Sequence, residues 1–248
     1  DGEVEKWLRV GGPLGIREVP NQAGIFPNHL EDERDDPESL LNDAAWYECD
    51  GHASPVTDSD EDAWQTLKDY VEAGFMRKFT SYKSLAEFLG VDPVISELIV
   101  ITKTRAGKTK KRIILNLKAS GISAASHNTE RVLLPTSSDV AWDLTELLDK
   151  LREGDDITVA VLDFKDAFFQ IPVLDCERPF LVTCMRGEYF LFERAAQGSR
   201  GAPLLWARTA ALINRLSSSL ASPHILRTSF YVDDPIIAVA GSFEVRRR

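Results

Sequence analysis

Cysteine is scarce in this sequence, and long apolar runs are missing. The three cysteines, Cys49, Cys176 and Cys184, are odd in number and irregularly spaced. This argues against a disulfide framework and favours reduced thiols in an intracellular protein, cytoplasmic or nuclear. No run approaches the ~18 apolar residues of a membrane-spanning helix, and no basic flank followed by an apolar core marks a secretory signal. We therefore expect no membrane partner.

Basic residues are outnumbered, with 29 Lys and Arg against 39 Asp and Glu and a formal net charge of −10. Taken over the whole chain, this balance argues weakly against nucleic-acid binding. The excess acid is concentrated in residues 1–62, whereas the remainder holds slightly more Lys and Arg than Asp and Glu. We interpret residues 1–62 as an acidic, partly disordered leader with no assigned function. The residues beyond this leader therefore remain candidates for nucleic-acid binding.

The rest of the chain alternates helical patterns with pairs of apolar strands. Its length of 248 residues suffices for one large domain or two small ones. Apolar spacing and end signals predict helices over about 62–74, 84–89, 138–151 and 203–220. Strand pairs, each around a turn, are predicted over about 96–118, 180–193 and 226–240. Helices set between antiparallel strand pairs indicate an α+β domain.

Two stretches carry acids where predicted strands end. The apolar, β-branched run over 158–162 predicts a buried strand, and it ends on Asp163. Asp233 and Asp234 stand between two short apolar runs, which predicts a hairpin with both acids at its tip. Adjacent carboxylates are costly to bury unless a cation neutralises them. Two Mg²⁺ ions, or Mn²⁺, about 3.5–4 Å apart would do so and suit phosphoryl transfer.

The predicted hairpin over 96–118 is strongly basic around its turn. Its cations are Lys103, Arg105, Lys108, Lys110, Lys111, Arg112 and Lys118, and residues 98–118 contain no acid. Such a hairpin is either merely solvated or a clamp for phosphates of a triphosphate or a nucleic-acid backbone. The residue pattern alone leaves both readings open.

Taken together, these stretches resemble a reverse transcriptase of the kind found in retroviruses and long-terminal-repeat retrotransposons. The matching motifs are LDFKDAFFQIP at 162–172, QGSRGAP at 197–203, YVDD at 231–234, and Arg112 four residues before Asn116. The resemblance covers about residues 60–242. It implies a polymerase right hand of fingers and palm over 63–242, with an antiparallel palm sheet packed on helices, and a basic tail at 243–248. The resemblance does not extend to the family's primer grip, thumb or RNase H domain.

The resemblance also implies a reaction and a set of site residues. A primer 3′-hydroxyl would attack the α-phosphorus of a dNTP on an RNA or DNA template, releasing pyrophosphate. The expected metal ligands and catalytic residues are Asp163, Asp233 and Asp234. The expected dNTP-binding residues are Lys103, Arg112, Phe164 through its backbone N–H, Phe168, Gln197 and Gly198. Phe168 would lie beneath the sugar and exclude a 2′-hydroxyl, because a ring gives that group neither room nor a hydrogen bond.

Some positions depart from the family's pattern, and alternatives remain. Asn116 and Lys118 stand where the family usually has Asp and Arg, and Pro235 follows the tetrad where an apolar residue is usual. Proline weakens strand pairing unless it lies at a sheet edge. Phe168 could instead be a core ring, with Phe169 exposed. At the level of function, the alternatives are a catalytically inactive palm-like module that binds nucleic acid or protein, and an RNA-templated RNA polymerase.

Overall fold

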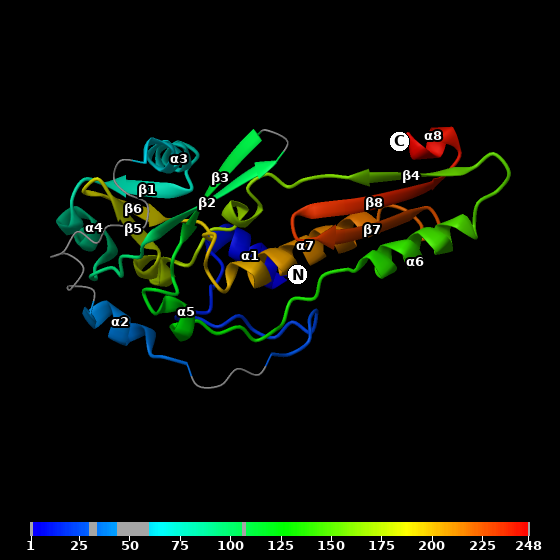
Figure 1. Ribbon diagram of the computed structural model, residues 1–248. Coiled ribbons are helices and arrows are strands. Elements are labelled where there is room, and N and C mark those ends of the chain that lie inside the picture. The colour runs from blue at the N-terminus through cyan, green and yellow to red at the C-terminus, as the bar shows by residue number, and fades with distance from the viewer. Residues whose placement is uncertain (1, 30–33, 44–59, 106–107, 248) are drawn as a thin grey trace.

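The computed structural model describes residues 2–29, 34–43, 60–105 and 108–247, with only the backbone described for 42–43, 100–105 and 108–111. The molecule is elongated, with a compact body at one end and a three-stranded sheet lined by helices at the other (Figure 1). The helices are α1 (Gly2–Val10), α2 (Pro37–Asp43), α3 (Glu61–Glu72), α4 (Tyr82–Leu89), α5 (Ile122–Ala125), α6 (Ser137–Leu148), η2 (Ala167–Gln170), η3 (Asp175–Phe180), α7 (Ala202–Ser218) and α8 (Phe243–Arg246).

All the sheets are antiparallel. The strands are β1 (Met76–Phe79), β2 (Leu98–Arg105), β3 (Lys108–Leu115), β4 (Asp156–Val161), β5 (Val182–Met185), β6 (Glu188–Phe192), β7 (Leu226–Tyr231) and β8 (Asp234–Gly241). They form sheets in the orders β1–β6–β5, β2–β3 and β4–β8–β7. The mixture of helices and antiparallel sheets confirms the α+β prediction. Within the described residues, no helix is both long and apolar enough to cross a membrane.

Local signals set most helix ends within a residue or two of their predicted positions, whereas α6 ends at Leu148, three residues before its predicted end. Helix α4 begins after Ser81, whose side chain accepts from the N–H of Ser84, and ends at Gly90 in the left-handed conformation. Helix α6 has a capping box in which Thr136 and Asp139 bond reciprocally, so it begins at Ser137, one residue before its predicted start. These bonds satisfy N–H groups that the first turn of a helix leaves without partners.

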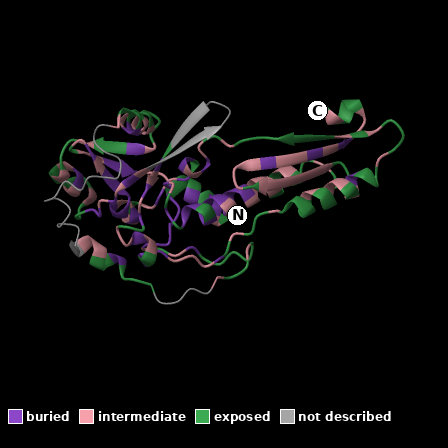
Figure 2. Cartoon of the chain, viewed as in Figure 1, coloured by how far each residue is buried: buried purple, intermediate pink, exposed green. Residues whose placement is uncertain are grey.

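Burial differs sharply between the two ends of the molecule (Figure 2). In the body, the β6 residues Phe190, Leu191 and Phe192 are almost fully buried. At the other end, Val159 and Val161 of β4 are exposed. The prediction of a buried strand before Asp163 was therefore wrong. Strand β4 is an edge strand that pairs only with β8, so its apolar run reflects strand propensity rather than burial.

The expectation of a solvated leader also differs from the structure. Val4 and Trp7 of α1, together with Leu14 and Ile16, are buried in the main core. The backbone packs closely there, because a Cβ at Gly201 would lie only 2.2 Å from the Leu14 carbonyl oxygen. Charge composition misled the prediction, since it averaged this apolar segment with the acid-rich stretch that follows.

Two buried acids hold the segment after α1 in place. The carboxylate of Glu177 accepts hydrogen bonds from the backbone N–H groups of Leu14, Ile16, Arg17 and Glu18. Burial raises the pKa of Glu177, and those four N–H groups offset part of the rise. The carboxylate thus serves as an internal acceptor for a loop that has no strand partner along this stretch.

The second acid, Glu130, belongs to a buried ion cluster on α7. The guanidinium of Arg208, 1% exposed, lies 2.9 Å from the Glu130 carboxylate and 3.2 Å from that of Glu3. It also donates to the Asn21 carbonyl and lies over the Trp7 ring, 5.3 Å from its centroid. Arg208 therefore ties the N-terminal segment to the long helix that runs under the β4–β8–β7 sheet.

Candidate active site

The chain after β4 and the start of β8 are joined by backbone hydrogen bonds. The N–H of Leu162 donates to the Pro235 carbonyl at 3.0 Å, and the N–H of Phe164 donates to the Asp233 carbonyl at 2.9 Å. The antiparallel ladder between β4 and β8 therefore continues beyond β4, up to the turn that precedes β8. Two acid-bearing stretches that are far apart in the sequence meet there.

This register sets the relation between the predicted acids. Asp163 lies between the two bonded residues and is therefore opposite Asp234. Directly opposite residues in an antiparallel pair point to the same face, with Cβ atoms about 4.5–5.5 Å apart. Asp233 lies beside them in the turn. Asp163 is exposed, and Asp233 and Asp234 are half-buried. The end of β4 and the turn between β7 and β8 lie at the inner end of the sheet, near the middle of the molecule (Figure 1).

The hairpin that carries Asp233 and Asp234 has a strained turn. Tyr231 pairs with Asp234, which leaves Val232 and Asp233 as a two-residue loop. Val232 has a φ of +58°, a region that β-branched residues rarely occupy and that glycine favours in such turns. The indole N–H of Trp206 donates to the Val232 carbonyl at 2.7 Å. The tip of the hairpin is thus held from α7.

Phe164 is engaged through both its backbone and its ring. We expected its backbone N–H to reach a triphosphate, but that N–H already donates to the Asp233 carbonyl and is not free for a nucleotide in this structure. The Phe164 ring meets Trp206 edge-to-face, with centroids 5.3 Å apart, and stacks on Phe230 at 6.0 Å. Phe164 therefore joins the Asp163 segment to the hairpin and to α7.

The basic hairpin and the glycine-containing loop lie against each other. The N–H of Leu115 donates to the Gln197 carbonyl at 3.0 Å. Gly198 has a φ of +107°, and a Cβ there would lie 2.2 Å from the Leu115 carbonyl oxygen, so this close approach needs glycine. Arg112 is exposed on β3. The side chain of Lys103 lies outside the described residues.

Tyr70 of α3 is affected by charges from both the basic hairpin and the segment after β4. Burial raises the pKa of its phenol; the charge of Asp166 raises it further, and that of Arg112 lowers it. Both charges therefore act on one hydroxyl. Asp166 occupies the N-cap position of η2 with a φ of +53° but makes no side-chain capping bond. Arg112 and the turn after Asp163 thus share one electrostatic environment.

The two neighbouring phenylalanines are separated by burial. Phe169 is buried and stacks on Phe75 with centroids 4.7 Å apart and on Phe192 at 6.3 Å. Phe168 is half-buried against the same core. The alternative in which Phe169 is the exposed ring was therefore wrong. Phe168 retains an accessible part, and its role as a sugar gate stays a prediction.

The acids do not form a finished metal cage. Among the described residues, no three His, Cys, Asp or Glu side chains come together in a group that could hold an ion as they stand. The donors are nonetheless of the kind that Mg²⁺ prefers, namely carboxylate oxygens. The predicted Mg²⁺ sites remain a prediction based on donor chemistry and on the paired backbone.

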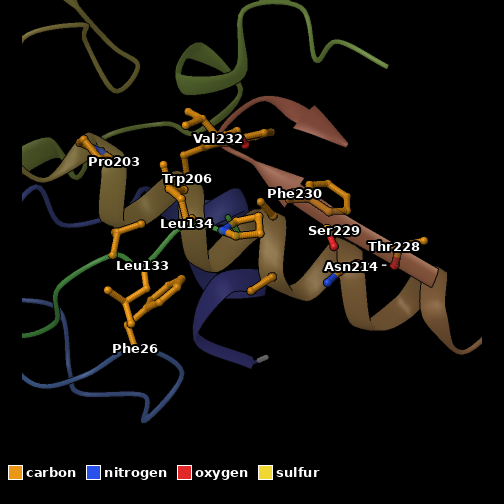
Figure 3. Close-up of a pocket in the computed structure, with 15 residues that line it drawn as sticks. Phe26, Leu133, Leu134, Pro203, Trp206, Asn214, Thr228, Ser229, Phe230 and Val232 are labelled. Atoms are coloured by element: carbon orange, nitrogen blue, oxygen red, sulfur yellow. Dashed lines mark hydrogen bonds between the residues drawn. The ribbon is translucent and has the colours of Figure 1, made fainter. Parts of the chain in front are cut away.

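An apolar pocket lies next to the β7–β8 hairpin, between α7, β7 and residues 132–135 (Figure 3). Its volume is about 420 Å³. Trp206 and Val232 line its upper end, and Phe26, Leu133 and Leu134 lie across from β7. The hydrogen bond that supports the turn therefore lies at the wall of a cavity rather than deep in solid packing.

Trp206 and Tyr70 were missed by the sequence analysis. The sequence analysis placed both helices, α7 and α3, from apolar spacing and end signals and assigned no contacts to their individual side chains. A tryptophan on the apolar face of a helix carries an N–H that needs an acceptor when buried, and this was the available signal for Trp206. Nothing in the pattern around Tyr70 indicated that Arg112 and Asp166 would lie near it.

Comparisons with known proteins support the fold. No protein-family model and no curated protein matches the chain. Among solved structures, it is similar to the foamy viral protease-reverse transcriptase dRH in complex with ds DNA, with 15% sequence identity and a TM-score of 0.50. The match covers 99% of this chain and 35% of that one, so the chain spans about a third of that protein's length. At this identity, the likeness shows a reverse-transcriptase-like fold alone.

Proposed function

We propose that this chain is the fingers and palm portion of an RNA-directed DNA polymerase of a retroelement. It would add dNTPs to a primer 3′-hydroxyl on an RNA or DNA template. The observation that carries the proposal is the backbone pairing of the Asp163 segment with the Asp233–Asp234 turn. Acids from distant parts of the sequence thereby share one sheet end, as a reaction on a phosphate-bound metal requires.

Asp163, Asp233 and Asp234 would hold Mg²⁺ or Mn²⁺ in this proposal. When bound, two such ions supply activation of the 3′-hydroxyl and charge neutralisation of the departing pyrophosphate. Asp163 and Asp234 point to one face of the sheet, and Asp233 stands next to them at the tip of the turn. The bond that forms joins the primer oxygen to the α-phosphorus, and the bond that breaks releases pyrophosphate.

The nucleotide would be bound between the basic hairpin and the acids. Arg112, with Lys103 on the paired strand β2, would contact the β- and γ-phosphates. Gln197 and Gly198 would face the nucleotide, because their loop is bonded to β3 just beyond Arg112. The effect of the Arg112 charge on Tyr70, shared with that of Asp166, supports this placement.

The decisive test replaces Asp163. Asp163→Asn keeps the size of an exposed side chain while removing a charged ligand, so the chain should fold normally yet lose primer extension. Asp175→Asn, an exposed acid in η3, is the matched control and should retain extension. Extension is measured with a primed RNA template and dNTPs, in the longest form of the protein that contains this chain. Undiminished synthesis by Asp163→Asn would reject the proposal. A wild-type protein that binds the primed template but extends nothing would favour the inactive palm-like module.

Arg112 provides a second test. Arg112→Ala should raise the KM for dNTPs while leaving affinity for the primed template nearly unchanged, because the proposed contact is with the triphosphate. Arg131→Ala, another exposed arginine, serves as the control. If both variants alter KM equally, the hairpin is a solvated element rather than a phosphate clamp.

A further inference from the structure

One residue of α7 touches both acid-bearing segments. Trp206 is 2% exposed. Its indole N–H donates to the Val232 carbonyl at 2.7 Å, and its ring meets Phe164 edge-to-face with centroids 5.3 Å apart. Val232 directly precedes Asp233, and Phe164 directly follows Asp163. A single side chain thus contacts the immediate neighbours of two predicted metal ligands.

The contact with Val232 falls where the backbone most needs support. Val232 has a φ of +58° in a two-residue turn, a conformation that a β-branched side chain disfavours. Its carbonyl is part-buried and accepts from Trp206, and a buried acceptor left without a donor is costly. The indole N–H satisfies that carbonyl and thereby favours the strained turn over relaxed alternatives.

The ring contact adds a second constraint. Phe164 is fixed to the turn by its N–H bond to the Asp233 carbonyl, and its ring also stacks on Phe230. Trp206, Phe164 and Phe230 therefore form an aromatic cluster that underlies both segments. Because α7 is itself anchored in the main core, this cluster relates the two acid-bearing segments to a rigid element.

We propose that Trp206 is a positioning residue that holds the Asp163 segment and the Asp233–Asp234 turn together at one end of the sheet, as metal binding by their carboxylates would require. The inference rests on the proposed function, since it assigns Trp206 a part in that same site. The Trp206 side chain does not contact substrate. It acts through the Val232 carbonyl and the Phe164 ring. An ordinary core tryptophan would contribute to stability alone, and the two roles predict different results.

The test removes the N–H and keeps a ring. Trp206→Phe is compared with Trp64→Phe, the same change at a half-buried tryptophan that packs edge-to-face on Phe190 in the body. Mn²⁺ affinity is measured by electron paramagnetic resonance titration of the full chain, and amide hydrogen exchange is measured over residues 226–241. We expect Trp206→Phe to weaken Mn²⁺ binding roughly tenfold, as loss of a residue supporting metal ligands typically does. It should also speed exchange at the turn, and Trp64→Phe should change neither.

A rescue experiment separates positioning from packing. Val232→Gly removes the side chain that strains the turn, and glycine is the residue preferred at that position. In the Val232→Gly background, the further change Trp206→Phe should therefore cost much less Mn²⁺ affinity than it does alone. Equal losses in the two backgrounds would overturn the proposal. If Trp206→Phe fails to fold, benzothienylalanine at position 206 keeps the bicyclic ring and removes only the donor.

The outcomes also distinguish this inference from the proposed function. If wild type and Asp163→Asn bind Mn²⁺ equally, the acids are not the metal site and the proposed function fails. Amide hydrogen exchange over residues 226–241 would then be the measurement that tests whether Trp206 holds the turn. If Asp163→Asn loses Mn²⁺ binding but Trp206→Phe retains it, with unchanged exchange at the turn, the proposed function stands and Trp206 is a packing residue.

Discussion

The β1–β6–β5 sheet and the β4–β8–β7 sheet have the same number of strands and opposite surroundings. In the first, β6 lies between two partners, and its Phe190 and Phe192 are buried with rings from α3 and η2 packed against them. In the second, edge strand β4 is exposed, and β7 is only half-buried despite the helix beneath it. The central strand of the first sheet is covered by packed side chains, whereas the second sheet is exposed along β4, the strand that leads to Asp163.

The difference teaches how the molecule combines stability with an accessible site. Stacked rings and buried ion pairs concentrate in and around the body, where they need no exposure to solvent. The open sheet depends on helix α7 for its position, because α7 packs on β7 and also enters the main core. Changes in the body should therefore alter stability, whereas changes at the open end should alter chemistry with little effect on folding.

Arg208 should give the largest effect on stability. Arg208→Met keeps an apolar stem of similar length but leaves Glu130, fully buried, without its cation. Breaking a buried ion pair on one side typically costs about 3–5 kcal/mol. Two backbone N–H groups, from Ala23 and Gly24, still donate to the Glu130 carboxylate in the variant. We therefore expect a loss of stability toward the lower end of that range. Chemical denaturation measures it, with Arg215→Met on the exposed face of the same helix as the control. A loss equal to that of the control would show that the ion cluster does not anchor the body.

Glu177 comes next, and its effect depends on pH. Glu177→Gln replaces one carboxylate oxygen, which accepts from backbone N–H groups, with an amide NH₂ that cannot accept. We expect the variant to lose about 1–3 kcal/mol of stability. Burial raises the pKa of Glu177 in the folded chain above its ordinary value of 4.5. The folded state therefore holds this proton more firmly than the unfolded state, and stability from this group falls as pH rises above about 4.5.

Denaturation of wild type and Glu177→Gln across pH isolates this slope. The other carboxyl groups titrate in both proteins and cancel in the difference. Wild-type stability should fall relative to the variant as pH rises through the range just above 4.5. A difference that stays flat with pH would mean that the four N–H groups hold the pKa at its ordinary value.

The adjacent rings of Phe168 and Phe169 test the boundary between the two regions. Phe169→Leu removes a ring stacked on both Phe75 and Phe192 and should cost about 2 kcal/mol. Phe168→Leu changes a half-buried ring and should cost less than about 1 kcal/mol.

In primer extension, Phe168→Ala should admit ribonucleotides while still using dNTPs. Equal stability losses, or continued rejection of ribonucleotides by an active Phe168→Ala variant, would contradict the division of roles.

Sequence reasoning succeeded where local chemistry decides the outcome. Gly90 ends α4 because only a left-handed residue closes that helix cheaply, and Pro203 lies in the first turn of α7. The acids at the hairpin tip followed from their flanking apolar runs. In each case, a short stretch of sequence was enough to predict both the helix or hairpin and the residue at which it ends, so no knowledge of distant contacts was needed.

It failed where long-range contacts decide. The apolar residues of β4 indicate a strand equally well at an edge or in a core, and only the sheet order distinguishes the two. The segment that contains Leu14 and Ile16 looked like part of a charged leader, because the bonds that hold it come from Glu177, far along the chain. The same limit hid Trp206, whose acceptor lies on another element.

Pro235 should give the smallest effect, and it tests why the second sheet is open. Sequence reasoning expected proline to weaken pairing unless it lay at an edge. The structure places it instead in β8, the central strand. Its carbonyl accepts from the N–H of Leu162, and in an antiparallel pair of this kind the two residues exchange both bonds. Proline has no N–H to return to the Leu162 carbonyl.

Pro235→Val should restore that second bond between β8 and the segment leading to Asp163. A backbone hydrogen bond contributes about 0.5–1.5 kcal/mol net, and valine suits a buried strand position, so we expect stabilisation of about 1 kcal/mol or less by denaturation. Hydrogen exchange at Leu162 and Phe164 should slow at the same time. Pro223→Val, at an exposed position before β7, is the control and should leave both unchanged. If Pro235→Val lowers stability, the fixed φ of proline in β8 matters more than the missing bond. The open end of the sheet would then be set by backbone stiffness rather than by an incomplete ladder.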